Sequence, residues 1–203
     1  MKLLDIEING FKSFANTVKI PIDKDLIAFI GPNGCGKSNI ADAIKWVLGE
    51  QNPREIRCER QSDVIFSGSE LKAAQGLAEV TLRLSNEDKK IPLNYNEIEI
   101  TRRLYKSGES EYLLNRTPVR LKDISKLLSG TGLGESSYSL FKASVIDELL
   151  KPNSTLINDL LSEASGIAKY KLDKKETIKK IQSTKDALKR AVSYTHLRAH
   201  ETP

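Results

Sequence analysis

The alternation of apolar and polar residues along the first 120 or so positions predicts a β-sheet. A period of two is typical of strands that bury one face and expose the other. Alternation is present in 2–8 and 79–84, and strands are also predicted at 17–20, 97–104 and 111–114. The last two are separated by Lys106-Ser-Gly-Glu109, a short turn sequence that predicts a hairpin.

Helical spacing follows the predicted hairpin. Leu121 to Leu128 is predicted as a short helix, and Ser129 to Ser139 as a loop rich in Gly and Ser. Ser154 to Ala164 is predicted as a helix that Ser154 caps. From Ile167 onward, Gly and Pro are absent until the last residue, and five of eight positions spaced three or four apart are apolar. This pattern fits either the start of a coiled coil or an exposed amphipathic helix.

A strand, a loop and a helix are predicted in succession near residue 30. Leu26 to Ile30 is a short apolar run that predicts a buried strand. Asn39 to Leu48 has apolar residues at helical spacing, and Gly49 is a plausible end of that helix. Between them lies GPNGCGKS, Gly31 to Ser38, which matches the phosphate-binding pattern G-x-x-x-x-G-K-[ST].

The spacing of this loop has a chemical reason. Glycines let the backbone turn so that successive N–H groups face an anion, and the helix that follows adds the positive end of its dipole. Lys37 is then placed to reach the β and γ phosphates of a nucleotide, and the Ser38 hydroxyl to bind Mg²⁺.

Composition adds a basic segment and two thiols to this picture. The net charge is +5, and Lys169 to Arg190 holds nine basic and three acidic residues, a surplus of six. That surplus fits contact with DNA phosphates or a solvated helix face, and charge alone leaves both open. Cys35 and Cys58 are expected to be free thiols in a reducing compartment. No apolar run is long enough to predict a signal peptide or a membrane span.

An ordered set of motifs resembles a known family. The segments are Ile8 to Phe14, Gly31 to Gln51, Asp63 to Ser69, Gly108 to Asn115, Pro118 to Ile124, Gly130 to Gly134 with Tyr138-Ser139, and Glu163 to Lys171. In this order they resemble the amino-terminal half of the ATPase head of bacterial structural maintenance of chromosomes (SMC) proteins. The resemblance covers about residues 1 to 192.

The resemblance implies an α/β fold of the P-loop, ABC-ATPase type, divided in sequence. Residues 1–165 would form the amino-terminal lobe of a split head, and 166–192 the start of a long coiled-coil helix. Residues 193–203 resemble a foreign tail found on unrelated sequence fragments and are expected not to be native. The carboxy-terminal half of the head would supply the signature motif and the Walker B acid.

The resemblance also implies the ligands and the residues that hold them. ATP and Mg²⁺ are the expected cofactors, with Ser38 as the metal ligand. The nucleotide-binding residues carried over from the family are Lys12, Ser13, Gly31, Pro32, Asn33, Gly34, Cys35, Gly36, Lys37, Ser38 and Asn39. Arg57 stands where the family has an arginine that faces the composite site, and its guanidinium is expected to steady charge during phosphoryl transfer. A surface arginine without that role is the alternative.

Two departures from the family limit the expected activity. No signature motif or Walker B acid is recognised in the chain, so on its own it is expected to hydrolyse ATP poorly. After Tyr138-Ser139 the family has Gly-Gln-Gly, whose glutamine helps to hold Mg²⁺ and water, whereas this chain has Lys142-Ala-Ser144. Ala143 has no group that can act as a ligand.

The partners implied by the family are those of a chromosome-organising machine. They are DNA without sequence preference, the carboxy-terminal half of the same head, a second copy that meets it through heads and hinge, and kleisin-type accessory subunits. The complete protein is expected in the cytoplasm, at the nucleoid, and not at a membrane.

Three other functions fit part of the sequence. A coiled-coil DNA-repair ATPase of the RecF/RecN kind would share the phosphate loop, but Gly108 to Asn115 and Gly130 to Tyr138 favour an SMC protein. A self-contained phosphotransferase would need a base for the acceptor and a second acid for Mg²⁺, and neither stands out. A fragment that only binds nucleotide or partners is compatible with the SMC interpretation.

Overall fold

The computed structural model describes residues 1–129, 131, 133, 157–158, 161 and 165–200. The strands, in chain order, are β1 (Leu3–Asn9), β2 (Val18–Pro21), β3 (Leu77–Ser85), β4 (Glu97–Tyr105), β5 (Ser110–Leu114) and β6 (Thr117–Val119). The helices are α1 (Lys37–Val47), α2 (Leu121–Leu128) and α5 (Ile167–His200), with two short 3-10 turns, η1 (Pro53–Ile56) and η2 (Gln61–Val64). None of the helices within this described part is both long and apolar enough to span a membrane.

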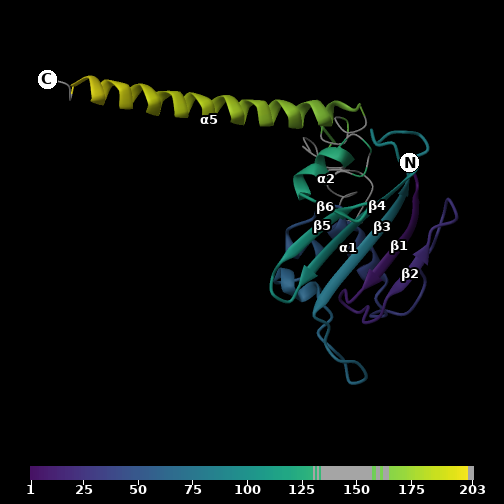
Figure 1. Cartoon of the computed structure of the whole chain (residues 1–203). Helices are drawn as coiled ribbons and strands as arrows, with labels where there is room; N and C mark the ends of the chain where they lie inside the picture. The colour runs from purple at the N-terminus through teal and green to yellow at the C-terminus, as the bar shows by residue number, and fades with distance from the viewer. Residues whose placement is uncertain (130, 132, 134–156, 159–160, 162–164, 201–203) are drawn as a thin grey trace.

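The six strands form one antiparallel sheet in the order β2-β1-β3-β4-β5-β6 (Figure 1). The long pair at its centre, β3 and β4, is in register from Leu77 opposite Tyr105 to Ser85 opposite Glu97. In the sheet, β1 lies between β2 and β3, so the chain must pass from the edge strand β2 to the central strand β3, and α1, η1 and η2 form this connection. The phosphate loop is therefore part of the segment that joins the two strands on either side of β1.

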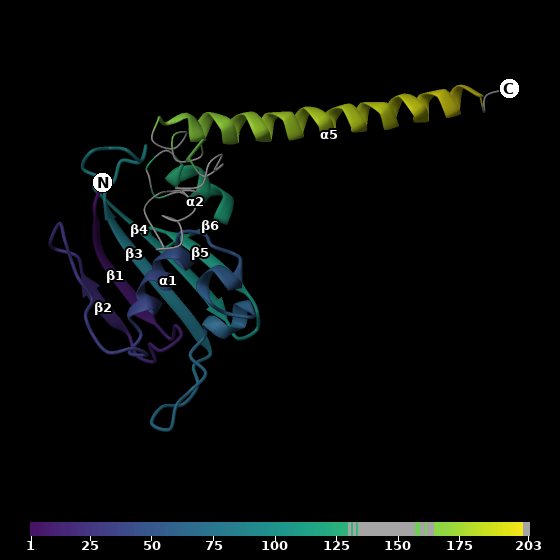
Figure 2. The ribbon, with the colours of Figure 1, turned by 180° about the vertical axis from the view of Figure 1, so that it is seen from behind.

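Helix α1 packs on one face of this sheet, across β3 and β4 (Figure 2). Every second residue of the central strands turns to that face, and Ile6, Ile8, Val80, Leu82 and Ile100 are at most 1% exposed. Their partners on the helix include Ala43, Trp46 and Val47. Burying this apolar area from water is the main favourable term that holds helix and sheet together.

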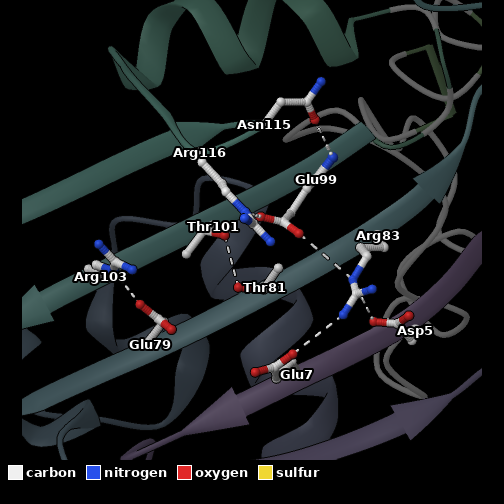
Figure 3. Close-up of polar contacts among 10 residues, drawn as sticks. All are labelled: Asp5, Glu7, Glu79, Thr81, Arg83, Glu99, Thr101, Arg103, Asn115 and Arg116. Atoms are coloured by element: carbon white, nitrogen blue, oxygen red, sulfur yellow. Dashed lines mark hydrogen bonds and ion pairs between the residues drawn. The ribbon is translucent and has the colours of Figure 1, made fainter. Parts of the chain in front are cut away.

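The opposite face of the sheet carries cross-strand polar pairs (Figure 3). Thr81 and Thr101 face each other with 2.8 Å between their hydroxyl oxygens, and Arg103 pairs with Glu79 directly opposite. Arg83 forms an ion pair with Asp5, with Nε 3.2 Å from Oδ1, and also reaches Glu7 and Glu99. Because opposite charges alternate across the strands, each pair stabilises the register by a few tenths of a kcal/mol to about 1 kcal/mol.

The sequence-based strand and helix predictions are largely confirmed. Strands β1 to β5 fall on the five ranges predicted as strands, Lys106 to Glu109 forms the predicted turn, and α2 has the predicted bounds. Strand β6 was not predicted. It is three residues long and contains Pro118, so neither its length nor its composition gives a strand pattern. The predicted loop at 129–139 and helix at 154–164 lie mostly outside the described residues.

The predicted buried strand at Leu26 to Ile30 is wrong for this chain. No strand is present there, and Leu26 and Ile30 are 89% and 92% exposed. An apolar run of five residues becomes a buried strand only when neighbouring strands cover both of its faces and edges. Among the described elements, none pairs with this segment.

Helix α5 runs away from the sheet as a single long rod (Figure 1). Two ion pairs tie its first turns to α2, Lys122 to Glu176 at 3.0 Å and Lys126 to Asp173 at 3.6 Å. Its apolar positions stay half exposed, among them Ile178, Ile181 and Leu188. This helix confirms the predicted helical spacing, and its exposed apolar stripe is what the start of a coiled coil presents before a second helix covers it.

Candidate nucleotide-binding site

The loop before α1 has the backbone geometry of an anion cradle. Gly34 and Gly36 take left-handed conformations, with φ of +85° and +94°. Gly36 is the N-cap of α1, and the first turn of that helix contains no acidic residue and no side-chain cap. The N–H groups and dipole at this helix end are therefore available to a phosphate.

A second loop, just after β1, packs against the cradle. A Cβ built on Gly36 would lie 2.7 Å from Ser13 Oγ, so the two loops touch at a point that only glycine can occupy. Three residues later, in the first turn of α1, Asn39 donates from Nδ2 to the same Ser13 oxygen at 2.8 Å. The contact connects the 11–14 turn to the first turn of α1.

Lys37 lies folded over its own loop. Its ammonium donates to the carbonyl oxygens of Gly31 at 2.6 Å and Pro32 at 2.5 Å, and it lies 3.7 Å from Cys35 Sγ. Two backbone carbonyls are neutral acceptors, whereas phosphate oxygens carry full charge and bind an ammonium more strongly. The lysine is thus held inside the cradle by contacts that a phosphate can replace.

Three segments of the chain meet at one carboxylate, that of Asp42. Asp42 is on α1, one turn after Ser38, and its side chain is 8% exposed. Lys12 Nζ lies 2.6 Å from Oδ2, and Arg57 reaches the same oxygen through Nη2 at 2.5 Å and Nε at 3.2 Å. Lys12 also donates to the carbonyl oxygen of Ile56. Buried charge of this kind is tolerated because it is paired and hydrogen-bonded.

The two cations face an open groove of about 550 Å³ beside the cradle. Its walls include Lys12, Asn39, Arg57, Cys58 and Ser67. Arg57 is 53% exposed at its side chain, while Lys12 is 11% exposed. Partial burial raises the pKa of the Cys58 thiol, which keeps it protonated near neutral pH. Cys35 and Cys58 are both free thiols, as predicted.

The structure brings most of the predicted residues into one region. Lys12, Ser13, Gly36 and Asn39 lie in contact around the helix start, and Arg57 joins them through Asp42. Pro32, Asn33 and Gly34 are exposed on the loop, and Ser38 is exposed in the first turn of α1. The Pro32 carbonyl oxygen accepts from Lys37, and within the described residues no side-chain hydrogen bond or ion pair assigns a role to Asn33 or Ser38. Ala143 lies outside the described residues.

Sequence analysis missed Asp42. The available signal was its position, since an acidic residue one turn after Ser38 falls on the same helix face as Trp46, which is buried. A charged side chain among buried helix positions needs a partner of opposite charge, and Lys12 and Arg57 are basic residues that sequence analysis had already assigned to the site.

The residues present fit a nucleotide phosphate. The cradle has two left-handed glycines, an uncapped helix start and a lysine bound only to neutral carbonyls and a thiol. For Mg²⁺ the fit is partial. Ser38 is in the first turn, but the residues that the structure describes contain no group of three or more His, Cys, Asp or Glu side chains arranged around a metal position.

Comparison with known proteins places this geometry in a family. The model of the RecF/RecN/SMC N terminal domain matches residues 2–145. A chromosome partition protein Smc of Bacillus subtilis is 43% identical over 196 residues, which is 97% of this chain and 16% of that protein. Another Smc, from Desulfitobacterium hafniense, is 45% identical over 188 residues. The chain thus spans about 16% of the length of these curated relatives.

Solved structures agree with the sequence comparison. The Smc head domain of Pyrococcus furiosus, with an extended coiled coil and bound to the C-terminal domain of ScpA, matches with a TM-score of 0.73 and 33% identity. The match covers 93% of this chain and 48% of that one. A chain from a study of ATP-driven dimerization and DNA-stimulated activation of SMC ATPases matches with a TM-score of 0.72 and 32% identity. Here 78% of this chain and 99% of that one are covered. The chain belongs to the RecF/RecN/SMC N-terminal domain family, with the fold of an SMC ATPase head and the start of its coiled coil.

Proposed function

We propose that this chain is the ATP-binding half of an SMC-type chromosome condensation and segregation ATPase. The observation that carries the proposal is the cradle itself. Gly36 sits at an uncapped helix start, and Lys37 lies within the loop on acceptors weaker than a phosphate. Relatives that share this segment are chromosome partition proteins, and one matched structure concerns ATP-driven dimerization.

Each predicted residue has a defined task in this proposal. Gly34 to Gly36 and the first turn of α1 offer N–H groups to the phosphates, and Lys37 gives a positive charge at their outer end. Ser38 would hold Mg²⁺, which would supply positive charge to offset that of the phosphates. Ser13 and Asn39 hold the second loop against the cradle.

Arg57 is the residue we assign to transition-state charge. Its guanidinium is half exposed beside the cradle and shares the Asp42 oxygen with Lys12, so it has donors left for a phosphate. Hydrolysis is assigned to the complete protein, in which a carboxy-terminal half supplies the acid that positions water. The isolated chain is expected to bind nucleotide with little turnover.

The partners follow the same reasoning. Matched head domains are described as bound to ScpA and as dimerizing with ATP. We assign corresponding partners to the complete protein: a kleisin-type subunit, a second copy that meets it through heads and hinge, and the other half of the head. DNA is the further partner, with the basic exposed side of α5 as one contact, and the nucleoid in the cytoplasm as the location.

Binding of a fluorescent ATP analogue to the chain, followed by titration, tests the proposal. Lys37→Ala removes the cradle's ammonium and is expected to weaken ATP binding by about a hundredfold, since charge-assisted contacts to phosphate are lost. Lys45→Ala is the matched control, because it makes the same change at the far end of the same helix. Equal affinity in Lys37→Ala and the wild-type chain would refute the site.

A further inference from the structure

We infer that Asp42 is a positioning residue that fixes where Lys12 and Arg57 present their charges to the nucleotide. The inference rests on the proposed function, since it concerns the same groove. It adds a residue that neither the phosphate-loop pattern nor the sequence motifs single out. The carboxylate touches no phosphate in this role. It acts only through the two cations.

The first observation is how the three side chains share one atom. Both cations bind Oδ2 of Asp42, Lys12 through Nζ at 2.6 Å and Arg57 through Nη2 at 2.5 Å. The strongest arginine–carboxylate pairs are bidentate, with two parallel N–H bonds, one to each carboxylate oxygen. Here its Nε, 3.2 Å away, is directed to that same oxygen, so the remaining terminal nitrogen stays free of the carboxylate.

The second observation is the backbone of the two cations. Lys12 has φ of +51° and Arg57 has φ of +57°, the left-handed region that non-glycine residues rarely adopt. Each such residue destabilises the fold by about 1–2 kcal/mol unless its surroundings hold it. Lys12 and Arg57 therefore both have strained backbone conformations, on separate loops, and the Asp42 carboxylate is the acceptor that both of them bind.

The third observation is the difference in burial. Lys12 is 11% exposed and makes a second bond to the Ile56 carbonyl, so it is the more buried of the two cations that pair with the acid. Arg57 is 53% exposed and borders the groove, which makes it the excess positive charge of the trio. Its orientation toward the groove depends on an anchor inside the protein, and Asp42 is that anchor.

Asp42 also connects this trio to the cradle. It follows Ser38 by four residues on α1, so both side chains rise from the same helix face, one turn apart. The distance from cations to phosphates is thereby set by the rigid helix that carries the phosphate loop. Lengthening or neutralising the side chain at position 42 should disturb that spacing without touching the cradle.

Titration of ATP and ADP against the chain and its variants tests this inference. Asp42→Asn is expected to weaken ATP binding about tenfold, the scale of one charge-assisted hydrogen bond, and ADP binding less. Asp42→Glu keeps the charge but displaces it by one methylene, and it is expected to give a similar loss. Normal ATP binding by Asp42→Glu would show that charge alone matters and would overturn the positioning role.

A double-substitution cycle separates positioning from general destabilisation. In an Arg57→Gln background, Asp42→Asn should reduce ATP affinity by less than it does in the wild-type background, because one of the two cations it acts through is gone and only Lys12 remains. Equal losses with and without Arg57 would contradict the inference. Arg57 is half exposed, so its replacement is expected to keep the fold. If Asp42→Asn unfolds, the ATP affinity of Asp42→Glu still tests the inference.

Asp5 provides a matched control on the opposite face of the sheet. It too is nearly buried and pairs with a lysine and an arginine, Lys19 at 3.5 Å and Arg83 at 3.2 Å (Figure 3). Asp5→Asn is expected to lower thermal stability but to leave the ratio of ATP to ADP affinity unchanged. If the wild-type chain bound ATP and lost it in Lys37→Ala while Asp42 variants bound normally, only this inference would fail. If the wild-type chain bound no nucleotide, the proposed function would fail and take the inference with it.

Discussion

Gly34 and Gly36 share a backbone conformation but differ in what surrounds them. Both have φ near +90°, a region that disfavours any Cβ. A Cβ on Gly36 would press against Ser13 Oγ at 2.7 Å, whereas a Cβ on Gly34 would meet no atom within 4 Å. The pair therefore separates the effect of backbone strain from the effect of contact between the two loops.

Substitution by alanine at these positions should give different results. Gly34→Ala is expected to destabilise the chain by about 1 kcal/mol through strain alone. Gly36→Ala adds the displacement of Ser13, so it should also break the Asn39 contact and reduce ATP affinity by about tenfold or more. Chemical denaturation and nucleotide titration of the two variants check this. Similar ATP affinities would show that the Ser13 contact is irrelevant to binding.

At the scale of single residues, the sequence predicted the cradle but not its support. Gly36, Lys37 and Ser38 follow a fixed spacing that reflects phosphate chemistry, so a local pattern is sufficient. Asp42 gains its role only when loops after β1 and after η1 fold onto α1. That meeting depends on tertiary packing, which no periodicity in a single segment encodes.

At the scale of elements, the end of α1 depends on a buried arginine from β4. Arg102 is 3% exposed and donates from Nη1 to the carbonyl oxygens of Trp46 at 2.8 Å and Glu50 at 2.7 Å. Its guanidinium also lies 4.5 Å from the Trp46 ring and 4.9 Å from the Tyr112 ring. Burial lowers the pKa of Arg102 from its usual value, yet the carbonyls at the helix end and the two ring faces compensate the charge.

Replacing Arg102 should therefore loosen the helix end in a graded way. Arg102→Ala is expected to destabilise the chain by about 3–5 kcal/mol, because it leaves a cavity and removes the donor that the Trp46 and Glu50 carbonyl oxygens share. Arg102→Met fills the space and is expected to lower stability by only about 1–2 kcal/mol. Trp46 is the single tryptophan, so its fluorescence during urea unfolding gives the unfolding midpoint of each of the two variants. Equal losses would mean that packing around the side chain contributes nothing.

The elements that sequence predicted well are those stabilised by their own pattern. Strands such as β3 alternate because one face meets α1 and the other meets polar partners, both of which are present in this chain. Leu26 to Ile30 has the pattern of a strand that is buried on both faces. Within the described fold, no element covers its side chains and no strand pairs with it. The sequence-based prediction identified a segment whose composition suits a buried strand. The structure shows the segment exposed and without a strand partner among the described elements.

At the scale of the whole molecule, the exposed apolar residues mark where further protein is expected. Leu26 and Ile30 are about nine-tenths exposed, directly before the phosphate loop, and apolar side chains in that state favour association. We expect that the carboxy-terminal half of the head, the partner assigned in the proposed function, would cover this segment. The phosphate loop would then be anchored on both sides, by α1 after it and by a buried strand before it.

This assignment predicts the effect of introducing charge into the segment. Leu26→Asp with Ile30→Asp should leave the isolated chain as stable as the wild type, because neither side chain is buried in it. Binding to the separately produced carboxy-terminal half should fall at least about a hundredfold, since two apolar contacts are lost and two charges must be buried. Leu71→Asp is the control, because Leu71 is 93% exposed on the loop before β3. Co-elution and calorimetric titration measure the affinity. Undiminished binding by the double variant would mean that the carboxy-terminal half docks elsewhere, and that the loop keeps an unpaired apolar segment at its entrance even in the complete head.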